Sequence, residues 1–378
     1  MKIGITCYPT HGGSGVIASE LALGLAQGGH EIHIVSYATP FRLRSFHQNV
    51  FIHEVEVASY PLFKYPPYAL SLATKLVDVA REYGLDLIHA HYAVPHAGSA
   101  YLAKKILRSK RLKTITTLHG TDITLVGTDK SFYQVIKFTI EESDGVTAVS
   151  RYLQKRTIDE FDIRREIRVI PNFVDTGRYK WDSSNCTREH FAPKGEKILM
   201  HASNFRPVKR VTDVVRIFAR VREQIPVKLL LVGEGPERLF VQQLVKELKL
   251  SDDVLFLGEQ DYLEKLMSCA DLFILPSEQE SFGLVALEAQ SCGVPVIGTP
   301  IGGLPEVVAD GETGFLLPVG DIAGMSTKAA ELLNNSELYG AFQKRARERA
   351  VRCFDSQLII PRYEAFYEEI LASTQHPS

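Results

Sequence analysis

The sequence lacks several features that would define a class of protein by themselves. It has no run approaching the roughly 20 apolar residues of a membrane-spanning helix. Its formal net charge of −2 gives no electrostatic reason to bind nucleic acid or an anionic membrane. The five cysteines are scattered without a C-x-x-C pair, which argues against a zinc site or a disulfide framework. Because no signal peptide is evident either, we expect a cytoplasmic protein.

What is present is a repeated alternation of short apolar strands and longer helical segments. A chain of 378 residues is long enough for two domains, each with its own core. A second alternating series begins after a poorly patterned polar segment at 180–196. The expected fold class is therefore α/β, with two doubly wound parallel sheets. The expected strands are 3–7, 31–36, 50–57, 86–92, 113–118 and 144–149, then 197–202, 227–232, 254–258, 272–275 and 296–299.

A strand, a turn and a helix in the second half form the most informative pattern of the chain. The apolar run Leu272–Leu275 precedes the turn, and residues 282–292 have the composition of a helix. A helix start offers free N–H groups, and Gly283 lets a ligand approach the backbone, so the turn suits a phosphate. Glu280 precedes the helix and Glu288 lies inside it, and both carboxylates can accept hydrogen bonds from sugar hydroxyls. The alternative is that Glu280 is an ordinary charge at the helix start and Glu288 an ordinary surface glutamate. The spacing alone does not decide between this alternative and a ligand-binding site.

A glycine-rich turn follows the first expected strand. Gly13, Ser14 and Gly15 precede an expected helix at 16–27, an arrangement that presents N–H groups to an anion. The G-x-G-x-x-A spacing from Gly13 also satisfies a loose dinucleotide fingerprint, which would indicate an oxidoreductase. That fingerprint requires an acidic residue after the second strand, and residues 36–39 supply none. The dinucleotide interpretation is therefore the weaker one.

Polar residues follow two further strands of the first half. Open parallel sheets bind ligands at the carboxyl ends of their strands, which favours His91 and Tyr92 as site residues. His119 and Thr121 follow the next strand, where a neutral imidazole can hydrogen-bond a sugar hydroxyl. The alternative is that Thr121 and Asp122 cap the following helix, and for Thr121 both interpretations stay open.

Cationic residues occur in two loops. Arg42 lies between two apolar residues after the second strand, where it either clamps a carboxylate or lies in a solvated loop. Arg206, Lys209 and Arg210 follow the first strand of the second half, where they can neutralise a departing diphosphate. Arg210 has the simpler alternative of a solvated side chain. Since no D-x-D pair occurs, these cations rather than a metal are the expected charge carriers.

The spacing of Glu280 and Glu288 resembles the E-x7-E motif of retaining glycosyltransferases of the GT-B fold, family 4. The resemblance extends over nearly the whole chain. It implies two Rossmann-like parallel-sheet domains that face each other across a cleft. The acceptor-binding domain would be 1–175, with the C-terminal helix 356–378 packing back on it, and the nucleotide-sugar-binding domain would be 176–355.

The resemblance also assigns roles to individual residues. In the family, the first glutamate contacts the donor sugar, the second holds the ribose, and the helix start binds the diphosphate. The family's Arg and Lys stand five positions apart; counting back from Lys209, the Arg position holds Asn204, and Arg206 is displaced by two. Backbone groups near Gln260 would read the uracil. The catalytic candidates are His119, Glu280, Lys209 and Arg206; the donor-binding candidates are Gly13, Ser14, Gly15, Asn204, Arg206, Lys209, Gln260, Ser281, Phe282, Gly283, Leu284 and Glu288; the acceptor candidates are Ser14, Arg42, Tyr92 and Thr121.

The resemblance further implies a reaction. N-acetylglucosamine would pass from UDP-N-acetylglucosamine to the hydroxyl of L-malate, with retention at the anomeric carbon, as the first step of bacillithiol biosynthesis. No cofactor and no metal are expected, and a homo-oligomer is an open option. The alternatives are a family 4 transferase with another small acceptor such as an inositol phosphate, a UDP-sugar 2-epimerase of the GT-B fold, and the dinucleotide oxidoreductase.

Overall fold

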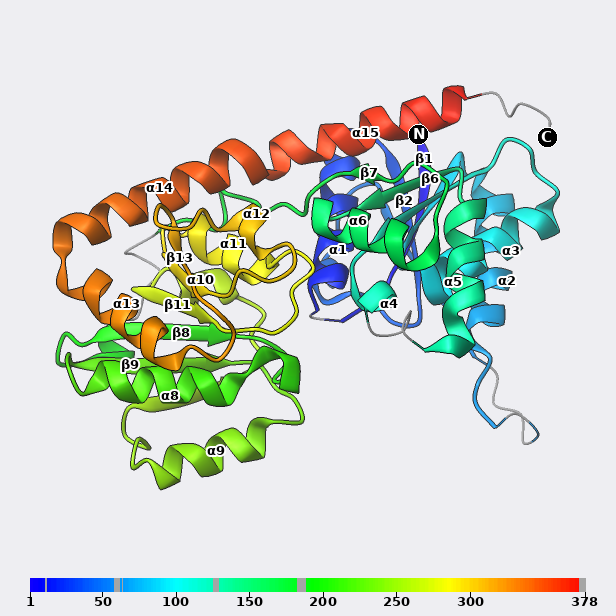
Figure 1. Ribbon diagram of the computed structural model, residues 1–378. Coiled ribbons are helices and arrows are strands. Elements are labelled where there is room, and N and C mark those ends of the chain that lie inside the picture. Colours follow the sequence, from blue (N-terminus) through cyan, green and yellow to red (C-terminus); the bar gives the residue numbers. More distant parts are fainter. Residues whose placement is uncertain (11, 58–61, 63, 125–128, 182–187, 374–378) are drawn as a thin grey trace. The chain divides into compact units, whose positions relative to one another are not determined.

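The computed structural model describes residues 1–10, 12–57, 62, 64–124, 129–181 and 188–373. The chain divides into two compact units, Met1–Asn172 with Gln357–Ser378, and Phe173–Ser356. These boundaries fall at 172/173 and 356/357, where the sequence predicted 175/176 and 355/356. Each unit is built on one parallel sheet with helices packed against it (Figure 1). The expected fold class is therefore confirmed.

The first unit contains a seven-stranded sheet in the order β3-β2-β1-β4-β5-β6-β7. Its neighbouring strands pair in parallel, as in the register of β1 with β2 and with β4. The strand order reverses between β1 and β4, the point beyond which open α/β sheets bind their ligands. The elements are β1 (Lys2–Thr6), α1 (Gly13–Gln27), β2 (Glu31–Ser36), η1 (Phe41–Leu43), β3 (Val50–Glu54), α2 (Tyr68–Tyr83), β4 (Leu87–His91), η2 (Ala93–Ala97), α3 (Gly98–Leu107), β5 (Lys113–Leu118), α4 (Thr121–Thr124), α5 (Lys130–Glu142), β6 (Gly145–Ala148), α6 (Arg151–Phe161), β7 (Arg168–Val169) and α15 (Ser356–Ala372).

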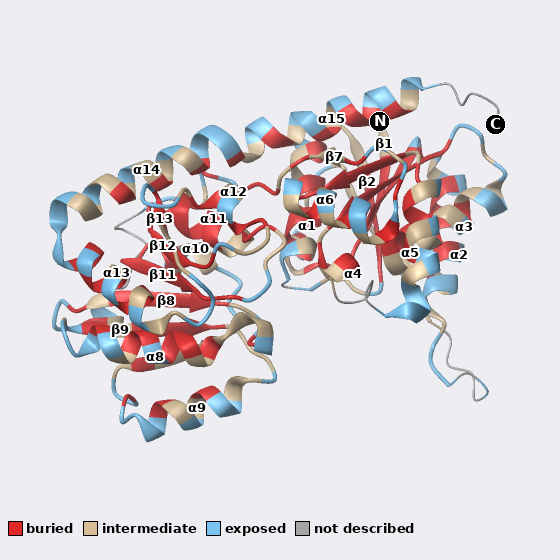
Figure 2. Cartoon of the chain, in the orientation of Figure 1, coloured by how far each residue is buried: buried red, intermediate tan, exposed pale blue. Residues whose placement is uncertain are grey.

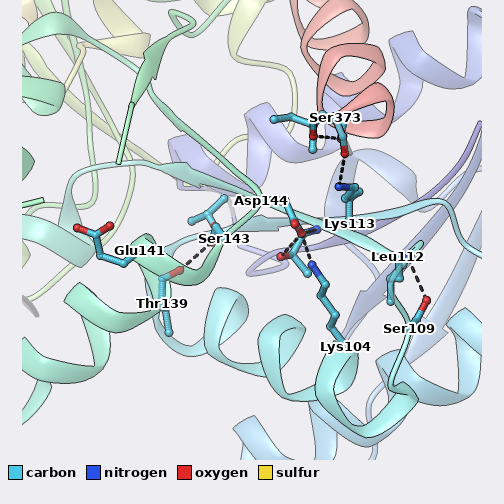
Figure 3. A network of polar contacts seen from close by, with 12 residues as sticks. Lys104, Ser109, Leu112, Lys113, Thr139, Glu141, Ser143, Asp144 and Ser373 are labelled. Atoms are coloured by element: carbon cyan, nitrogen blue, oxygen red, sulfur yellow. Dashed lines mark hydrogen bonds and ion pairs between the residues drawn. The ribbon is translucent and has the colours of Figure 1, made fainter. Parts of the chain in front are cut away.

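The C-terminal helix α15 packs on the sheet of the first unit. The hydroxyl of Tyr367 lies 2.7 Å from Nδ1 of His89 on β4. At the end of the helix, Nζ of Lys113 on β5 donates to the carbonyl oxygen of Ser373 at 2.9 Å (Figure 3). These contacts join residues far apart in the sequence, so α15 is an integral part of this unit.

A half-buried carboxylate joins several elements at the amino end of β6. Asp144 accepts a hydrogen bond from Nζ of Lys104 at 2.5 Å and from the N–H of Thr114 at 2.7 Å (Figure 3). Lys104 belongs to α3 and Thr114 to β5. This network lies before β6 begins, whereas the candidate site residues follow the ends of the strands.

The second unit contains a six-stranded sheet in the order β10-β9-β8-β11-β12-β13. Its strand order reverses between β8 and β11. Figure 2 shows the strands of both units largely buried and the outward helix faces exposed, as expected for parallel sheets covered by helices. The elements are α7 (Arg188–Phe191), β8 (Lys197–Ala202), η3 (Pro207–Lys209), α8 (Val211–Arg222), β9 (Val227–Val232), α9 (Arg238–Glu247), β10 (Val254–Gly258), α10 (Leu263–Met267), β11 (Leu272–Leu275), α11 (Leu284–Ser291), β12 (Val296–Gly298), α12 (Leu304–Val307), β13 (Gly314–Leu316), α13 (Ile322–Asn334) and α14 (Ser336–Phe354).

Two helices next to the candidate site begin at residues other than those predicted. Helix α1 begins at Gly13 rather than at 16, so the glycine-rich turn already forms its first turn. Helix α11 begins at Leu284 rather than at 282. Gly283 precedes it with φ +92°, a left-handed conformation that interrupts the helical path.

Two expectations about the composition can be compared with the described residues. Cys7, Cys292 and Cys353 are free, whereas Cys269 is disulfide-bonded, which the scattered spacing did not predict. Disulfide formation depends on the distance between two cysteines in the fold and not on their separation along the chain. None of the helices in the described ranges combines the length and the apolar character needed to cross a membrane.

Candidate functional site

Most of the candidate residues lie in the segments that follow β1, β4 and β5 in the first unit, and β8 and β11 in the second. Arg42 follows β2, Gln260 follows β10, and Glu288 lies within α11. These strands include the two pairs at which the strand order reverses. Loops at that position leave the sheet at its ligand-binding edge. Each unit therefore carries its own group of candidate residues.

The turn between β1 and α1 is shaped by a glycine. A Cβ on Gly15 would lie 2.4 Å from the carbonyl oxygen of Thr10 and 2.7 Å from that of Tyr8, so a larger residue would force the turn apart. Gly13 and Ser14 lie in the first turn of α1, which contains no acidic residue and has no side-chain cap. Its N–H groups can therefore bind an anion or a hydroxyl oxygen, as the predicted role of these residues requires.

Histidine and tyrosine rings gather beyond the ends of β4 and β5. We call His91, His96, His119, Tyr8 and Tyr92 the imidazole cluster. Nδ1 of His91 lies 2.8 Å from Nε2 of His119. The ring centroid of Tyr92 is 5.4 Å from that of His119 and from that of Tyr8, and Tyr8 meets His96 edge to face at 4.6 Å. The structure thus brings the predicted Tyr92 and His119 together and adds His96 and Tyr8, which no motif marked.

Burial keeps this cluster uncharged. It lowers the pKa of His96 and of His119 to about 3, and it lowers the pKa of His91 well below its usual range. Neighbouring histidines add to the shift for His91 and His119. Burial also raises the pKa of Tyr8 to about 12. At neutral pH these rings therefore act as uncharged hydrogen-bonding groups.

Thr121 and Asp122 form the start of the short helix α4. Thr121 is half-buried. The carboxylate of Asp122 caps the helix start, because Oδ1 accepts from the N–H of Gly120, the residue just before the helix, at 2.9 Å. Its Oδ2 also accepts from the N–H of Ala93 at 3.1 Å, a contact that capping does not explain. The second bond reaches the loop after β4. Sequence reasoning missed it because no local pattern shows which loops the sheet brings together.

Arg42 is held against α1. Its guanidinium lies 4.8 Å from the centroid of the Phe41 ring, and its Nε is 3.5 Å from Oε1 of Glu20. Since only 11% of the side chain is exposed, the alternative of a solvated loop is wrong. Its role in binding an acceptor stays a prediction.

Charged side chains join the loops after β8 and β11 in the second unit. We call Lys209, Arg210, Glu278 and Glu280 the ion-pair cluster. Nζ of Lys209 lies 2.5 Å from Oε1 of Glu280, and the same oxygen accepts from Oγ of Ser277 at 3.1 Å. The two strongest candidates of the second unit, 71 residues apart in sequence, are therefore in direct contact.

A second set of ion pairs, made by Arg210, lies beside that of Lys209 with Glu280. Nε of Arg210 is 2.5 Å from Oδ2 of Asp213, and its guanidinium also pairs with Glu278. The N–H of Glu278 donates to the carbonyl oxygen of Val208 at 2.8 Å. The alternative of a solvated Arg210 is therefore wrong, because the side chain connects the two loops that carry Lys209 and Glu280.

Glycines hold these loops by close backbone packing. A Cβ on Gly302, whose φ is +64°, would lie 1.7 Å from the carbonyl oxygen of Glu280. That oxygen also accepts from the N–H of Gly303 at 2.9 Å. In the same way, a Cβ on Gly235 would lie 2.0 Å from the carbonyl oxygen of Asn204. At Gly302 and Gly235, the close backbone approach is therefore one between loops of the chain itself.

Buried groups surround the start of α11. Phe282 is 3% exposed, and its ring packs edge to face on Phe354 at 5.7 Å. A Cβ on Gly283 would lie 2.6 Å from Cδ1 of Leu304. Glu288 is 6% exposed, so the alternative of an ordinary surface glutamate is wrong. The predicted role of Phe282 in donor binding stays a prediction.

The other predicted donor residues are more accessible. Ser281, Leu284 and Arg206 are half-buried, and Asn204 and Gln260 are exposed. Whether Asn204 or Arg206 takes the diphosphate position stays a prediction. Within the described part of the chain, no three His, Cys, Asp or Glu side chains form a group that could hold a metal ion.

Comparison with known proteins identifies the family. The chain belongs to the glycosyltransferases: residues 11–178 match Glycosyltransferase Family 4, and residues 183–349 match Glycosyl transferases group 1. The resemblance inferred from the E-x7-E spacing is thereby confirmed.

Individual relatives extend this result. The chain is 49% identical over 372 residues to the N-acetyl-alpha-D-glucosaminyl L-malate synthase of Bacillus anthracis, which covers 98% of this chain and 97% of the relative. It is 27% identical to the D-inositol 3-phosphate glycosyltransferase of Nocardia farcinica, over 86% of this chain and 78% of that relative. Among solved structures it resembles sucrose-phosphate synthase from Thermosynechococcus elongatus, with a TM-score of 0.82, 23% identity and coverage of 99% and 100%. It also resembles Anabaena HepE in complex with UDP and glucose, with a TM-score of 0.81 and 23% identity. That match covers 97% of this chain and 99% of the HepE chain. These structures show that the chain has the GT-B fold.

Proposed function

We propose that this glycosyltransferase moves N-acetylglucosamine from UDP-N-acetylglucosamine to the hydroxyl of L-malate, with retention at the anomeric carbon. In this assignment the reaction is the first step of bacillithiol biosynthesis. The observation that carries the proposal is the 49% identity to an N-acetylglucosaminyl malate synthase across 98% of this chain and 97% of that relative.

The second unit is assigned to the donor. Lys209 supplies a positive charge, and Arg206 lies in the same loop. Together with the N–H groups before α11, these cations would stabilise the charge that develops on the departing diphosphate. Glu280 would accept a hydrogen bond from a hydroxyl of the sugar, and Glu288 one from the ribose.

The contact between His91 and His119 supports one pair of tautomers. One of the two nitrogens, 2.8 Å apart, must carry the proton. Nε2 of His91 is buried and has no hydrogen-bond partner in the described part of the chain. Since a buried unpaired acceptor is less rare than a buried unpaired donor, we assign the proton to Nδ1 of His91. His119 then accepts at Nε2 and keeps Nδ1–H as a neutral donor for an oxygen of the sugar.

The first unit is assigned to the acceptor. L-malate carries two carboxylates, for which the guanidinium of Arg42 and the N–H groups at the start of α1 are suitable partners. Ser14, Tyr92 and Thr121 provide hydroxyl groups that can bind the remaining oxygens. These groups come from four different segments, which follow β1, β2, β4 and β5, so the shape of the acceptor as well as its charge would be recognised.

Retention requires either two displacements or a substitution on one face of the sugar. Two displacements need a nucleophilic carboxylate close to the anomeric carbon. Oε1 of Glu280 already accepts from Lys209 and Ser277, which suits a hydroxyl acceptor better than a nucleophile. We therefore assign a same-face substitution: the bond to UDP breaks as the malate oxygen bonds to the sugar, and the leaving phosphate takes the hydroxyl proton. Mass spectrometry of Glu280→Gln with donor tests this, because a covalent sugar–protein adduct at another residue would contradict it.

The decisive experiment incubates the purified protein with UDP-N-acetylglucosamine and EDTA, with and without L-malate. UDP release that depends on malate, together with the mass of a malate glycoside, would support the donor, the acceptor and metal independence at once. D-inositol 3-phosphate serves as the competing acceptor. Interconversion of the UDP-sugar without malate dependence would favour the epimerase instead.

A further inference from the structure

Asp122 is a buried carboxylate to which the proposed reaction gives no role. Its residue is 1% exposed, and it lies in the first turn of α4. Oδ1 accepts from the N–H of Gly120 at 2.9 Å, and Oδ2 accepts from the N–H of Ala93 at 3.1 Å. Gly120 belongs to the loop after β5 and Ala93 to η2, just after β4. One side chain therefore joins two loops of the imidazole cluster.

Each of these two N–H groups directly follows a candidate site residue. Gly120 follows His119, and Ala93 follows Tyr92. Tyr92 has φ +92° and ψ 138°, a conformation that a non-glycine residue keeps only where its surroundings hold it. The bond to Ala93 holds the peptide after Tyr92, and the N–H of Tyr92 donates to the carbonyl oxygen of Thr117 at 3.0 Å. The strained residue is thus held on both sides.

We propose that Asp122 is a positioning residue for glycosyl transfer, because its carboxylate ties the loop after β4 to the loop after β5 and so sets Tyr92 and His119 relative to each other. The inference rests on the proposed function for the reaction it affects. Loss of one acceptor would leave a buried N–H unpaired and would let the backbone of Tyr92 relax. Since the Tyr92 ring packs on His119 at 5.4 Å, relaxation would displace both side chains.

The charge of Asp122 changes in an accessible pH range. Burial raises its pKa to about 6, while the backbone N–H groups that it accepts from oppose the shift. The titratable side chains of the neighbouring segments are Tyr8 after β1, His91 on β4, Tyr92 between β4 and η2, His96 on η2 and His119 after β5. Burial keeps the three imidazoles neutral and the phenol of Tyr8 protonated between about pH 5 and about pH 8. Protonation of Asp122 removes one acceptor, so kcat should fall as the pH decreases through about 6.

The test compares the wild-type protein with Asp122→Asn, whose amide keeps one acceptor oxygen and replaces the other with a donor. Values of kcat and of KM for each substrate are measured from about pH 5 to about pH 8, and UDP binding is measured by calorimetry. At the upper pH we expect kcat to fall by about 100-fold, the scale of a misplacement near 1 Å. We expect UDP affinity to stay unchanged, and the decrease of kcat towards acid pH to disappear in the variant.

Asp129→Asn is the matched control. Asp129 also accepts a backbone N–H, that of Ser131 at 2.9 Å, but it is an exposed cap of α5. This variant should keep the wild-type kcat and pH profile. An Asp122→Asn protein that binds UDP, keeps kcat within about two-fold and retains the acid decrease would overturn the proposal.

Two further outcomes are also decisive. If Asp122→Asn does not fold, the wild-type profile is used: a decrease near pH 6 in kcat but not in UDP binding supports the proposal, and a flat profile overturns it. If the wild-type protein shows no malate-dependent turnover, the proposed function fails instead. The rate of donor hydrolysis then provides the comparison between wild type and variant.

Discussion

The two units hold their candidate residues by opposite electrostatic means. In the first unit, buried rings of the imidazole cluster contact one another as neutral groups, with the pKa of His119 lowered to about 3. In the second unit, the ion-pair cluster joins full charges, as in the 2.5 Å contact of Lys209 with Glu280. Neutral groups suit the hydroxyls of an acceptor or a sugar, whereas a diphosphate requires positive charge.

The difference also follows from burial and pairing. An imidazolium at His91, His96 or His119 would lose its hydration, and none of these rings forms a salt bridge with a carboxylate of the described residues, so the neutral form is favoured. Lys209 and Glu280 keep 20% and 9% of their side chains exposed and neutralise each other. The comparison predicts that acid affects the first unit and that removal of a cation affects the second.

The largest expected effect is a selective loss of stability of the first unit in acid. Burial lowers the pKa of His89, His96 and His119 to about 3, whereas His201 in the second unit is lowered to about 4. The unfolded chain binds more protons below its ordinary histidine pKa of 6.5, so the free energy of unfolding falls as the pH decreases from there. Each histidine lowered to about 3 contributes roughly 2 kcal/mol near pH 5.

Hydrogen exchange at about pH 7 and about pH 5, corrected for the intrinsic rate, would measure this loss in each unit. We expect amides of β4 and β5 to lose protection before those of β8 and β11. Equal loss in both units would contradict the comparison.

Lys209→Met should give the largest loss of activity. Removal of the cation leaves the departing charge without its partner, and kcat should fall by about 10²–10³. UDP release at saturating substrates measures the change. Lys228→Met is the control, because Nζ of Lys228 makes a similar contact with Oδ1 of Asp253 at 2.7 Å in the same unit. A comparable loss in the control would show that any broken ion pair of this unit has the same effect.

Gly302→Ala should act on the ion-pair cluster without changing any charge. The added Cβ would lie 1.7 Å from the carbonyl oxygen of Glu280, so the loop must move, and kcat should fall by up to about 100-fold. Gly311→Ala is the control for backbone strain without a clash, since Gly311 has φ +73° and no atom lies within 4 Å of the added Cβ. The control should lower thermal stability by about 1 kcal/mol with kcat unchanged. Equal kcat values for the two variants would remove Glu280 from the proposed mechanism.

Arg210→Met should have the smallest effect. Arg210 connects the two loops through Asp213 and Glu278, but it is assigned no contact with substrate. We expect a loss of stability of about 1 kcal/mol and a change in KM for the donor of only a few-fold. Thermal denaturation and initial rates measure the two quantities. A loss of kcat as large as that of Lys209→Met would indicate that Arg210 itself stabilises the transition state.

Local sequence patterns were sufficient for the fold class and for much of its detail. The strands β5, β8, β9, β10 and β11 occur at the predicted residues, because a short apolar run is visible without knowledge of its neighbours. The sequence predicted that a helix follows each of the two glycine-containing turns, but it did not predict the first residues of those helices, α1 and α11. The start of α11 depends on the φ of +92° at Gly283, where the side chain of Leu304 on α12 leaves no room for a Cβ.

The sequence by itself determined the alternation of strands and helices, and with it the loops in which polar residues occur. The tertiary structure alone decided the partners of those residues: Lys209 meets Glu280, Asp122 meets Ala93, and His89 meets Tyr367 across 278 positions of the chain. Helix and strand patterns arise from interactions between residues close in sequence. A partner is chosen by the order of the strands in the sheet, which brings distant loops to one edge and leaves no mark on either segment.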